Sequence, residues 1–155
     1  MTWYELFLFV HVATATVWVG GGAVLQVLAL RVLPSNDPVR MAGFAGDAEL
    51  LGMRVFTPAS LLLILSAIGL MLNDASPWEW SEPFVSVGLV VWVISFLAGV
   101  LYLGPTSGKI KKSIEATGPT SPESVRLIAN ILRYSRIELA LLVITIFMMT
   151  VKLGT

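Results

Sequence analysis

The chain has 155 residues, of which 56% are hydrophobic and 13% are charged, whereas an ordinary soluble domain carries about 25% charged residues. Its 10 basic and 10 acidic side chains balance, and it contains no cysteine. This composition excludes nucleic acid as a partner, which needs a surplus of Lys and Arg, and it excludes disulfides and thiolate chemistry. It predicts an integral membrane protein that contacts the lipid bilayer.

The first predicted membrane helix covers residues 4–31 and contains the only histidine. No charged side chain occurs between Leu6 and Leu30, and this is more than the roughly 20 residues that a helix needs to cross a bilayer. Lipid offers polar groups no partners, so the polar side of this helix should face other helices, with Gly20 to Gly22 allowing close approach. At about 100° per residue, that side comprises His11, Thr14, Ala15, Trp18, Gly22, Leu25, Gln26 and Ala29.

The second predicted span covers residues 52–73 and follows a short helix. Asp37 is expected to be the N-cap of that short helix and Pro38 its first residue, where the missing N–H costs nothing. We expect the short helix to lie along the membrane surface. Pro58 lies near the start of the second span and should bend it there.

The third predicted span covers residues 84–104 and carries Trp92. The segment from Gly104 to Lys109 resembles a phosphate-binding loop, but the glycine spacing is one residue too short and an isoleucine follows the lysine. We therefore expect Gly104 and Pro105 to end the helix.

The fourth predicted span covers residues 134–153, after a helix start that Thr120 or Ser121 caps. Its charge-free run from Leu139 to Val151 is too short to cross a membrane, so the span must include Glu138. Lys152 should reach the far headgroups.

Basic residues gather in the first and third loops, and the second loop has none. Cytoplasmic loops of membrane proteins carry an excess of Lys and Arg, so this asymmetry places both termini outside. The predicted fold is therefore all-α: a four-helix integral membrane bundle, N-out and C-out, that forms a single membrane domain over residues 1–155. The basic residues of the two cytoplasmic loops are Arg31, Arg40 and Arg54, then Lys109, Lys111, Lys112, Arg126, Arg133 and Arg136.

Two isolated charges lie at the cytoplasmic edge of apolar spans, namely Arg54 and Glu138. An unpaired charge at the centre of a span costs about 2.5 to 3.5 kcal/mol, and less near the edge. We expect the two side chains to form a charge pair between the second and fourth spans. The alternative is that they contact a substrate, a proton or a haem propionate.

His11 is the strongest candidate for a functional residue. One histidine without cysteine cannot build a tetrahedral metal site, but haem needs only one or two axial ligands. The residues by themselves leave three roles open for His11: a ligand, a proton carrier, or a packing residue that hydrogen-bonds a neighbouring helix.

Several segments of the chain resemble a known group of proteins. This group comprises small bacterial integral membrane proteins classed together as a domain of unknown function, and the resemblance covers essentially the whole chain. It implies a four-helix fold and a multi-pass location in the bacterial cytoplasmic (inner) membrane. The segments are Tyr4-Glu-Leu-Phe-Leu-Phe-Val-His11, Trp18-Val-Gly-Gly21, Gly52-Met-Arg-Val-Phe-Thr-Pro-Ala-Ser60, Gly104-Pro105 and Met149-Thr-Val-Lys152.

The first helix, with His11, Trp18 and the glycine pair that begins at Gly20, is more distantly similar to that of the copper-resistance D membrane domain and of HemJ-type protoporphyrinogen oxidases. In those families the histidine is associated with haem or with redox chemistry. The resemblance implies a prosthetic group, haem b, near His11.

The predicted function is therefore that of a small haem-associated membrane protein in electron transfer or a redox complex. In this hypothesis His11 ligates the haem iron, Thr14 or a backbone carbonyl takes the other ring proton, Gly22 leaves room for the macrocycle, and Trp18 or Trp92 packs on its edge. A second axial ligand would come from another copy of the chain or another subunit. The alternatives are a cofactor-free accessory subunit of a larger membrane complex and a small metal or proton transporter.

Overall fold

The computed structural model describes residues 1–151, and every regular element in that range is a helix. Four helices in the described range are long and apolar enough to cross a membrane, which confirms the predicted all-α four-helix membrane fold. The first is α1 (Trp3–Val32), followed by the short 3-10 turn η1 (Leu33–Ser35). The second joins α2 (Pro38–Leu51), η2 (Gly52–Phe56) and α3 (Thr57–Met71); the third joins α4 (Pro83–Ala98), η3 (Gly99–Leu103) and α5 (Gly104–Thr117); the fourth is α6 (Pro122–Val151).

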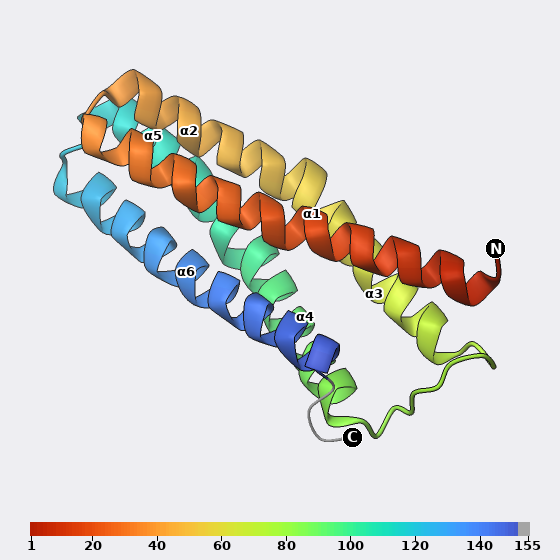
Figure 1. Ribbon diagram of the computed structural model, residues 1–155. Coiled ribbons are helices and arrows are strands. Elements are labelled where there is room, and N and C mark those ends of the chain that lie inside the picture. Colours follow the sequence, from red (N-terminus) through yellow and green to blue (C-terminus); the bar gives the residue numbers. More distant parts are fainter. Residues whose placement is uncertain (152–155) are drawn as a thin grey trace.

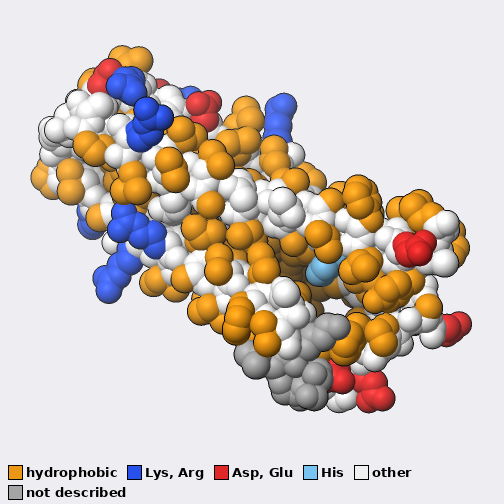
Figure 2. Space-filling view, in the orientation of Figure 1, with side chains coloured by type: hydrophobic (Ala, Val, Ile, Leu, Met, Phe, Trp, Pro, Cys, Tyr) orange, Lys and Arg blue, Asp and Glu red, His pale blue; other side chains and the backbone are white. Residues whose placement is uncertain are grey.

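Successive helices run in opposite directions (Figure 1). The start of α1, the end of α6 and the connection from α3 to α4 lie at one end of the bundle. The connections from α1 to α2 and from α5 to α6 lie at the other end, which we call the basic end because most Lys and Arg side chains visible in Figure 2 gather there. This distribution is the one that the loop charges predict. The last two residues of the predicted fourth span, including Lys152, lie outside the described residues.

The predicted helix starts agree with the structure. The Asp37 side chain accepts hydrogen bonds from the backbone N–H groups of Val39 and Arg40, with Pro38 as the first helical residue. At the start of α6, the backbone N–H of Ser124 donates to the Ser121 hydroxyl at 3.2 Å. Both caps satisfy N–H groups that have no partner inside the helix.

The structure corrects the prediction of a short helix along the membrane surface. Residues from Pro38 onward form the first part of a continuous helix that reaches Met71, and in Figure 1 this part runs beside α1 rather than across the end of the bundle. The join is η2, a π-helical turn in which the backbone N–H and the hydroxyl of Thr57 both donate to the Gly52 carbonyl. The Thr57 N–H bonds a carbonyl five residues back, so the hydrogen-bond pattern shifts just before Pro58, which has no N–H, and the helix continues past the proline.

The expected helix end at Gly104 and Pro105 is wrong for the same reason. The backbone N–H of Gly104 donates to the Gly99 carbonyl, which closes the π-helical turn η3. Pro105 follows as the second residue of α5, and the third helix continues to Thr117. In both long helices a proline therefore comes directly after the residue that closes a π turn.

The helices pack in different pairs along the bundle. Toward the termini α1 packs on α3 and α4 packs on α6, whereas at the basic end α2 packs on α5 and α5 on α6. Glycines allow close approach within the first two pairs, because the Phe7 ring lies over Gly69 and the Met149 side chain lies over Gly88. Small residues are what membrane helices use where their backbones come close together.

The large apolar side chains of the spans mostly point outward. Phe9, Leu65 and Leu101, for example, are all exposed, as expected when the surrounding solvent is lipid. A compact buried cluster exists only at the basic end of the described chain. It consists of Met41, Ala42, Ala45, Ile110 and Ile114.

Candidate functional site

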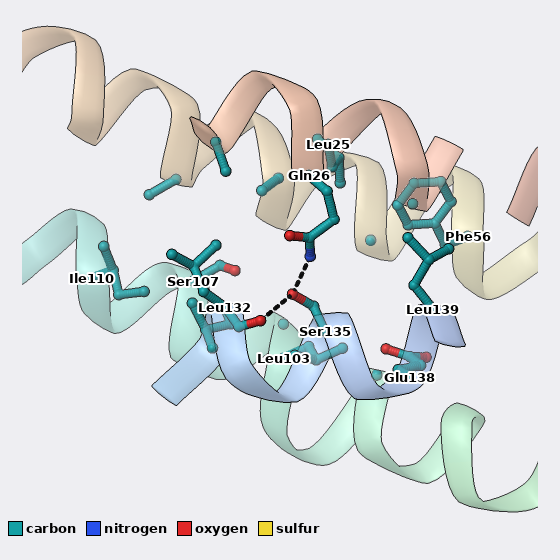
Figure 3. Close-up of a pocket in the computed structure, with 18 of the residues that line it drawn as sticks. Leu25, Gln26, Phe56, Leu103, Ser107, Ile110, Leu132, Ser135, Glu138 and Leu139 are labelled. Carbon is teal, nitrogen blue, oxygen red and sulfur yellow. Dashed lines mark hydrogen bonds between the residues drawn. The ribbon is translucent and has the colours of Figure 1, made fainter. Parts of the chain in front are cut away.

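A cavity of about 190 Å³ lies between the four long helices, where η2 contacts η3 (Figure 3). Trp18 and Gly22 of α1 line it, as does Glu138 of α6. Three of the residues singled out in the sequence therefore meet in one place. Phe56, the last residue of η2, also borders the cavity and lies over Gly21 of α1.

A hydrogen-bonded chain crosses the cavity between α1 and α6. The Gln26 side-chain amide donates to the Ser135 hydroxyl, and that hydroxyl donates to the Leu132 carbonyl at 3.4 Å (Figure 3). This arrangement occupies the amide nitrogen of Gln26. Its amide oxygen accepts no hydrogen bond from residues 1–151, so it remains available as an acceptor.

Glu138 is partly buried and lines the same cavity (Figure 3). Its carboxyl group makes no hydrogen bond or ion pair within residues 1–151, where the one ion pair joins the N-terminal ammonium to Glu5. The neighbouring basic residues of α6, Arg133 and Arg136, are exposed. The carboxyl group of Glu138 thus has no cation from the described protein.

The predicted pair between Arg54 and Glu138 is not formed. Arg54 is exposed and lines a separate groove of about 850 Å³ with Lys111 and Glu49, on α5 and α2. The sequence placed Arg54 and Glu138 at similar depths in the membrane. Depth does not determine the direction in which a side chain points, and the Arg54 and Glu138 side chains point toward different cavities.

Ser95 of α4 is a further polar group of the cavity without a partner in the described chain. It is 3% exposed, it lines the cavity, and its hydroxyl oxygen is buried with no hydrogen-bond partner among residues 1–151. A Ser hydroxyl in a membrane helix ordinarily bonds a carbonyl of its own helix, as Ser60 and Ser66 do here. Ser95 makes no such bond.

His11 does not line this cavity but contacts α3. Its ring nitrogen Nδ1 lies 3.2 Å from the Leu63 carbonyl oxygen, which also accepts a hydrogen bond from the Ser66 hydroxyl at 2.9 Å. A carbonyl only accepts, so Nδ1 carries the proton and Nε2 carries the lone pair. The histidine, pale blue in Figure 2, is visible at the molecular surface beside a hollow.

Thr14 and Trp92 have partners of their own. The Thr14 hydroxyl donates to the Val10 carbonyl at 2.7 Å and to the His11 carbonyl at 3.1 Å, so it bonds its own helix rather than the His11 ring. The Trp92 indole N–H donates to the Ser60 carbonyl at 2.9 Å, and its ring stacks on Phe96 at 5.1 Å. The predicted site therefore separates into a cavity and a histidine contact.

Sequence reasoning placed Gln26 on the polar side of the first helix but did not predict its hydrogen bond to Ser135, and it did not predict the two π turns. A signal for the π turns was present, because a glycine lies six residues before a proline in both helices: Gly52 before Pro58 and Gly99 before Pro105. Ser95 lies at helical spacing from Trp92 on the third span, but the sequence does not show that its hydroxyl lacks a partner, because a serine that bonds its own helix has the same sequence context.

Comparison with known proteins gives one match. A family model described as predicted integral membrane protein (DUF2269) matches residues 5–153. No curated protein and no solved structure matches the chain. The matched family description names a location in the membrane and no activity.

Proposed function

The chain belongs to this family of predicted integral membrane proteins, and from that premise we propose that it is a haem-associated protein of the bacterial cytoplasmic membrane with His11 as an axial ligand. One observation carries the proposal. The hydrogen bond from Nδ1 of His11 to the Leu63 carbonyl leaves Nε2 as the nitrogen with a free lone pair. Ligating histidines almost always donate their other ring N–H in this way.

His11 fits the role of an iron ligand, and the other residues of the hypothesis fit less well. A Cβ added at Gly22 would lie 3.8 Å from the Leu139 Cδ1 atom. The Trp92 indole N–H donates to the Ser60 carbonyl, and the Trp92 ring stacks on Phe96. These contacts argue against a macrocycle over Gly22 or Trp92. The proposal therefore rests on His11, and Trp18 belongs to the separate cavity.

Haem b bound at His11 would supply one-electron chemistry. The chain has one histidine, so a second histidine ligand would come from another copy of the chain or from another subunit. The proposal thus includes a homo-oligomer or a larger membrane complex for electron transfer.

The competing function is that of a cofactor-free accessory subunit, and the same hydrogen bond favours it. A ring that joins α1 to α3 through the Leu63 carbonyl has a packing role without any iron. Such interhelical bonds contribute about 0.6 kcal/mol on average in membrane proteins. The two functions differ in whether His11 Nε2 has a ligand.

The test is visible absorption of the protein expressed with ample haem and purified in detergent. We expect a Soret band with reducible α and β bands in the wild type and none in His11→Asn. Asparagine keeps an N–H donor near the position of Nδ1 but is not an iron ligand, so the variant separates ligation from packing. Ser66→Ala, which removes only the other donor to the Leu63 carbonyl, should keep the full Soret band.

A colourless wild type would contradict the proposal, as would a His11→Asn protein with an undiminished Soret band. Thermal unfolding followed by circular dichroism serves as the control for folding. A cooperative unfolding transition in His11→Asn shows that the variant is folded, so that its loss of colour is due to the lost ligand.

A further inference from the structure

We infer that the cavity between the four long helices is a binding site for a small amine, with the Glu138 carboxylate as the counter-ion of its ammonium group. This inference is independent of the haem proposal, because His11 is absent from the cavity walls. It rests on the size of the cavity, on the charge of its lining and on polar groups of the lining that have no hydrogen-bond partner within residues 1–151.

The size of the cavity sets the size of the ligand. Its volume is about 190 Å³, and an apolar protein cavity of about 150 Å³ is large enough to bind benzene. A ligand with one six-membered ring and one or two further heavy atoms therefore fits. Trp18, Phe56 and Phe96 line the cavity, and aromatic rings of this kind attract ammonium groups.

The charge of the lining determines the sign of the ligand. Glu138 lines the cavity, and within residues 1–151 no Lys, Arg or His does. A carboxylate in apolar surroundings needs a cation with hydrogen-bond donors. An anionic ligand is therefore excluded, and a cation is favoured.

The available acceptors favour an amine over a metal ion. An ammonium group has up to three N–H donors, and the cavity offers the Glu138 carboxylate, the Ser95 hydroxyl and the Gln26 amide oxygen as acceptors. Within residues 1–151 no group of three or more His, Cys, Asp and Glu side chains is placed to hold a metal ion. One carboxylate with neutral oxygens suits N–H donors instead.

Ser95 is the strongest sign of a ligand. Its hydroxyl oxygen has no partner among residues 1–151 although the residue is only 3% exposed, and native proteins rarely leave such a group unsatisfied. A donor inside the cavity would satisfy it. The two π turns at Gly52 and Gly99 border the same space, and π turns occur frequently at functional sites.

The inference is tested with benzylamine and its uncharged counterpart benzyl alcohol, by titration calorimetry of the whole chain in lipid nanodiscs. We expect the wild type to bind benzylamine more tightly than benzyl alcohol. Glu138→Gln should weaken benzylamine binding about 10- to 100-fold, which corresponds to the loss of a charge-assisted hydrogen bond. The affinity for benzyl alcohol should change by less than about twofold, because that ligand makes no ion pair.

Two further variants complete the experiment. Glu123→Gln removes an exposed carboxylate from the first turn of the same helix and should leave benzylamine binding unchanged. Ser95→Ala should weaken benzylamine binding about 10-fold, the low end of the range for one hydrogen bond from a charged donor. No group within residues 1–151 bonds that hydroxyl, so we expect this variant to fold even if the Glu138 variant does not.

Three results would overturn the inference: no saturable binding of benzylamine by the wild type, equal benzylamine affinity in Glu138→Gln, or an equal loss in Glu123→Gln. His11→Asn should bind benzylamine like the wild type, since His11 is not in the cavity wall. Amine binding and the Soret band are separate readouts, so either proposal can fail without the other.

Discussion

Individual glycines have opposite roles in this bundle, depending on what faces them. A Cβ added at Gly69 would lie 2.7 Å from two atoms of the Phe7 ring, whereas a Cβ added at Gly20 would meet nothing within 4 Å. Gly69 therefore allows α1 and α3 to approach each other. Gly20 is exposed and makes no such contact.

Gly69→Ala should lower the free energy of unfolding by about 1 to 3 kcal/mol, the usual cost of overpacking. Gly20→Ala is the matched control, and it should raise the free energy of unfolding by up to about 1 kcal/mol because alanine favours the helix. The measurement is reversible unfolding of the two variants in mixed micelles. Equal effects of the two substitutions would show that Phe7 does not pack on Gly69.

The same dependence on surroundings governs the charged and polar residues. Arg54 and Glu138 are each isolated in the sequence, yet one lines a groove beside Lys111 and the other lines the central cavity. Thr14 and Ser95 both carry hydroxyl groups on membrane helices, but only the Ser95 hydroxyl lacks a partner in the described chain. The environment of these side chains decides which of them could contact a ligand.

Two kinds of helix feature organise the elements, namely caps and π turns. The π turns η2 and η3 let the second and third helices continue past Pro58 and Pro105.

Hydroxyl groups join α5 to α6 at the basic end. The Ser113 and Ser124 hydroxyl oxygens lie 2.8 Å apart, and the Ser121 hydroxyl donates to that of Ser124 at 2.9 Å. Ser124 is completely buried, so this network is protected from water.

Ser124→Ala should lower the free energy of unfolding by about 1 to 3 kcal/mol, because it leaves the buried Ser113 hydroxyl without that partner. The double variant Ser113→Ala/Ser124→Ala should cost less than the sum of the two single variants, with a coupling of at least about 0.5 kcal/mol. Denaturant unfolding of the four proteins measures that coupling. Additive single losses would count against a shared hydrogen bond.

For the whole molecule, the separation of charge between the two ends defines an orientation in the membrane. Basic residues lie at the end that carries the α1–α2 and α5–α6 connections (Figures 1 and 2). The opposite connection, from α3 to α4, holds Asp74, Glu79 and Glu82 and no basic residue. The positive-inside rule therefore predicts that the basic end lies in the cytoplasm and the opposite end outside.

Single-cysteine variants test this orientation, because the natural chain contains no cysteine. Ser81→Cys, in the α3–α4 connection, should react with a membrane-impermeant thiol reagent in intact spheroplasts. Ser35→Cys, after α1, should react only once the membrane is opened. Both side chains are exposed, so burial does not explain a difference, and the reverse labelling pattern would invert the topology.

The sequence by itself determined the number of spans, the fold class, the starts of α2 and α6 and the charge difference between the two ends. Hydropathy, capping residues and loop charges are properties of local stretches of chain, and they can be read without knowing which helices touch. The same reading placed Trp18, Gly22 and Glu138 among the candidate residues, and these three meet in the cavity.

Only the tertiary structure decided which helix faces meet. In lipid, an outward face and a helix-facing surface are equally apolar, so hydrophobicity does not distinguish them as it does in water. Each π turn also adds one residue to its helix and rotates the following side chains by roughly 100°. For these reasons the partner of the His11 ring, the separation of Arg54 from Glu138 and the unpartnered hydroxyl of Ser95 depended on packing that the linear pattern does not encode.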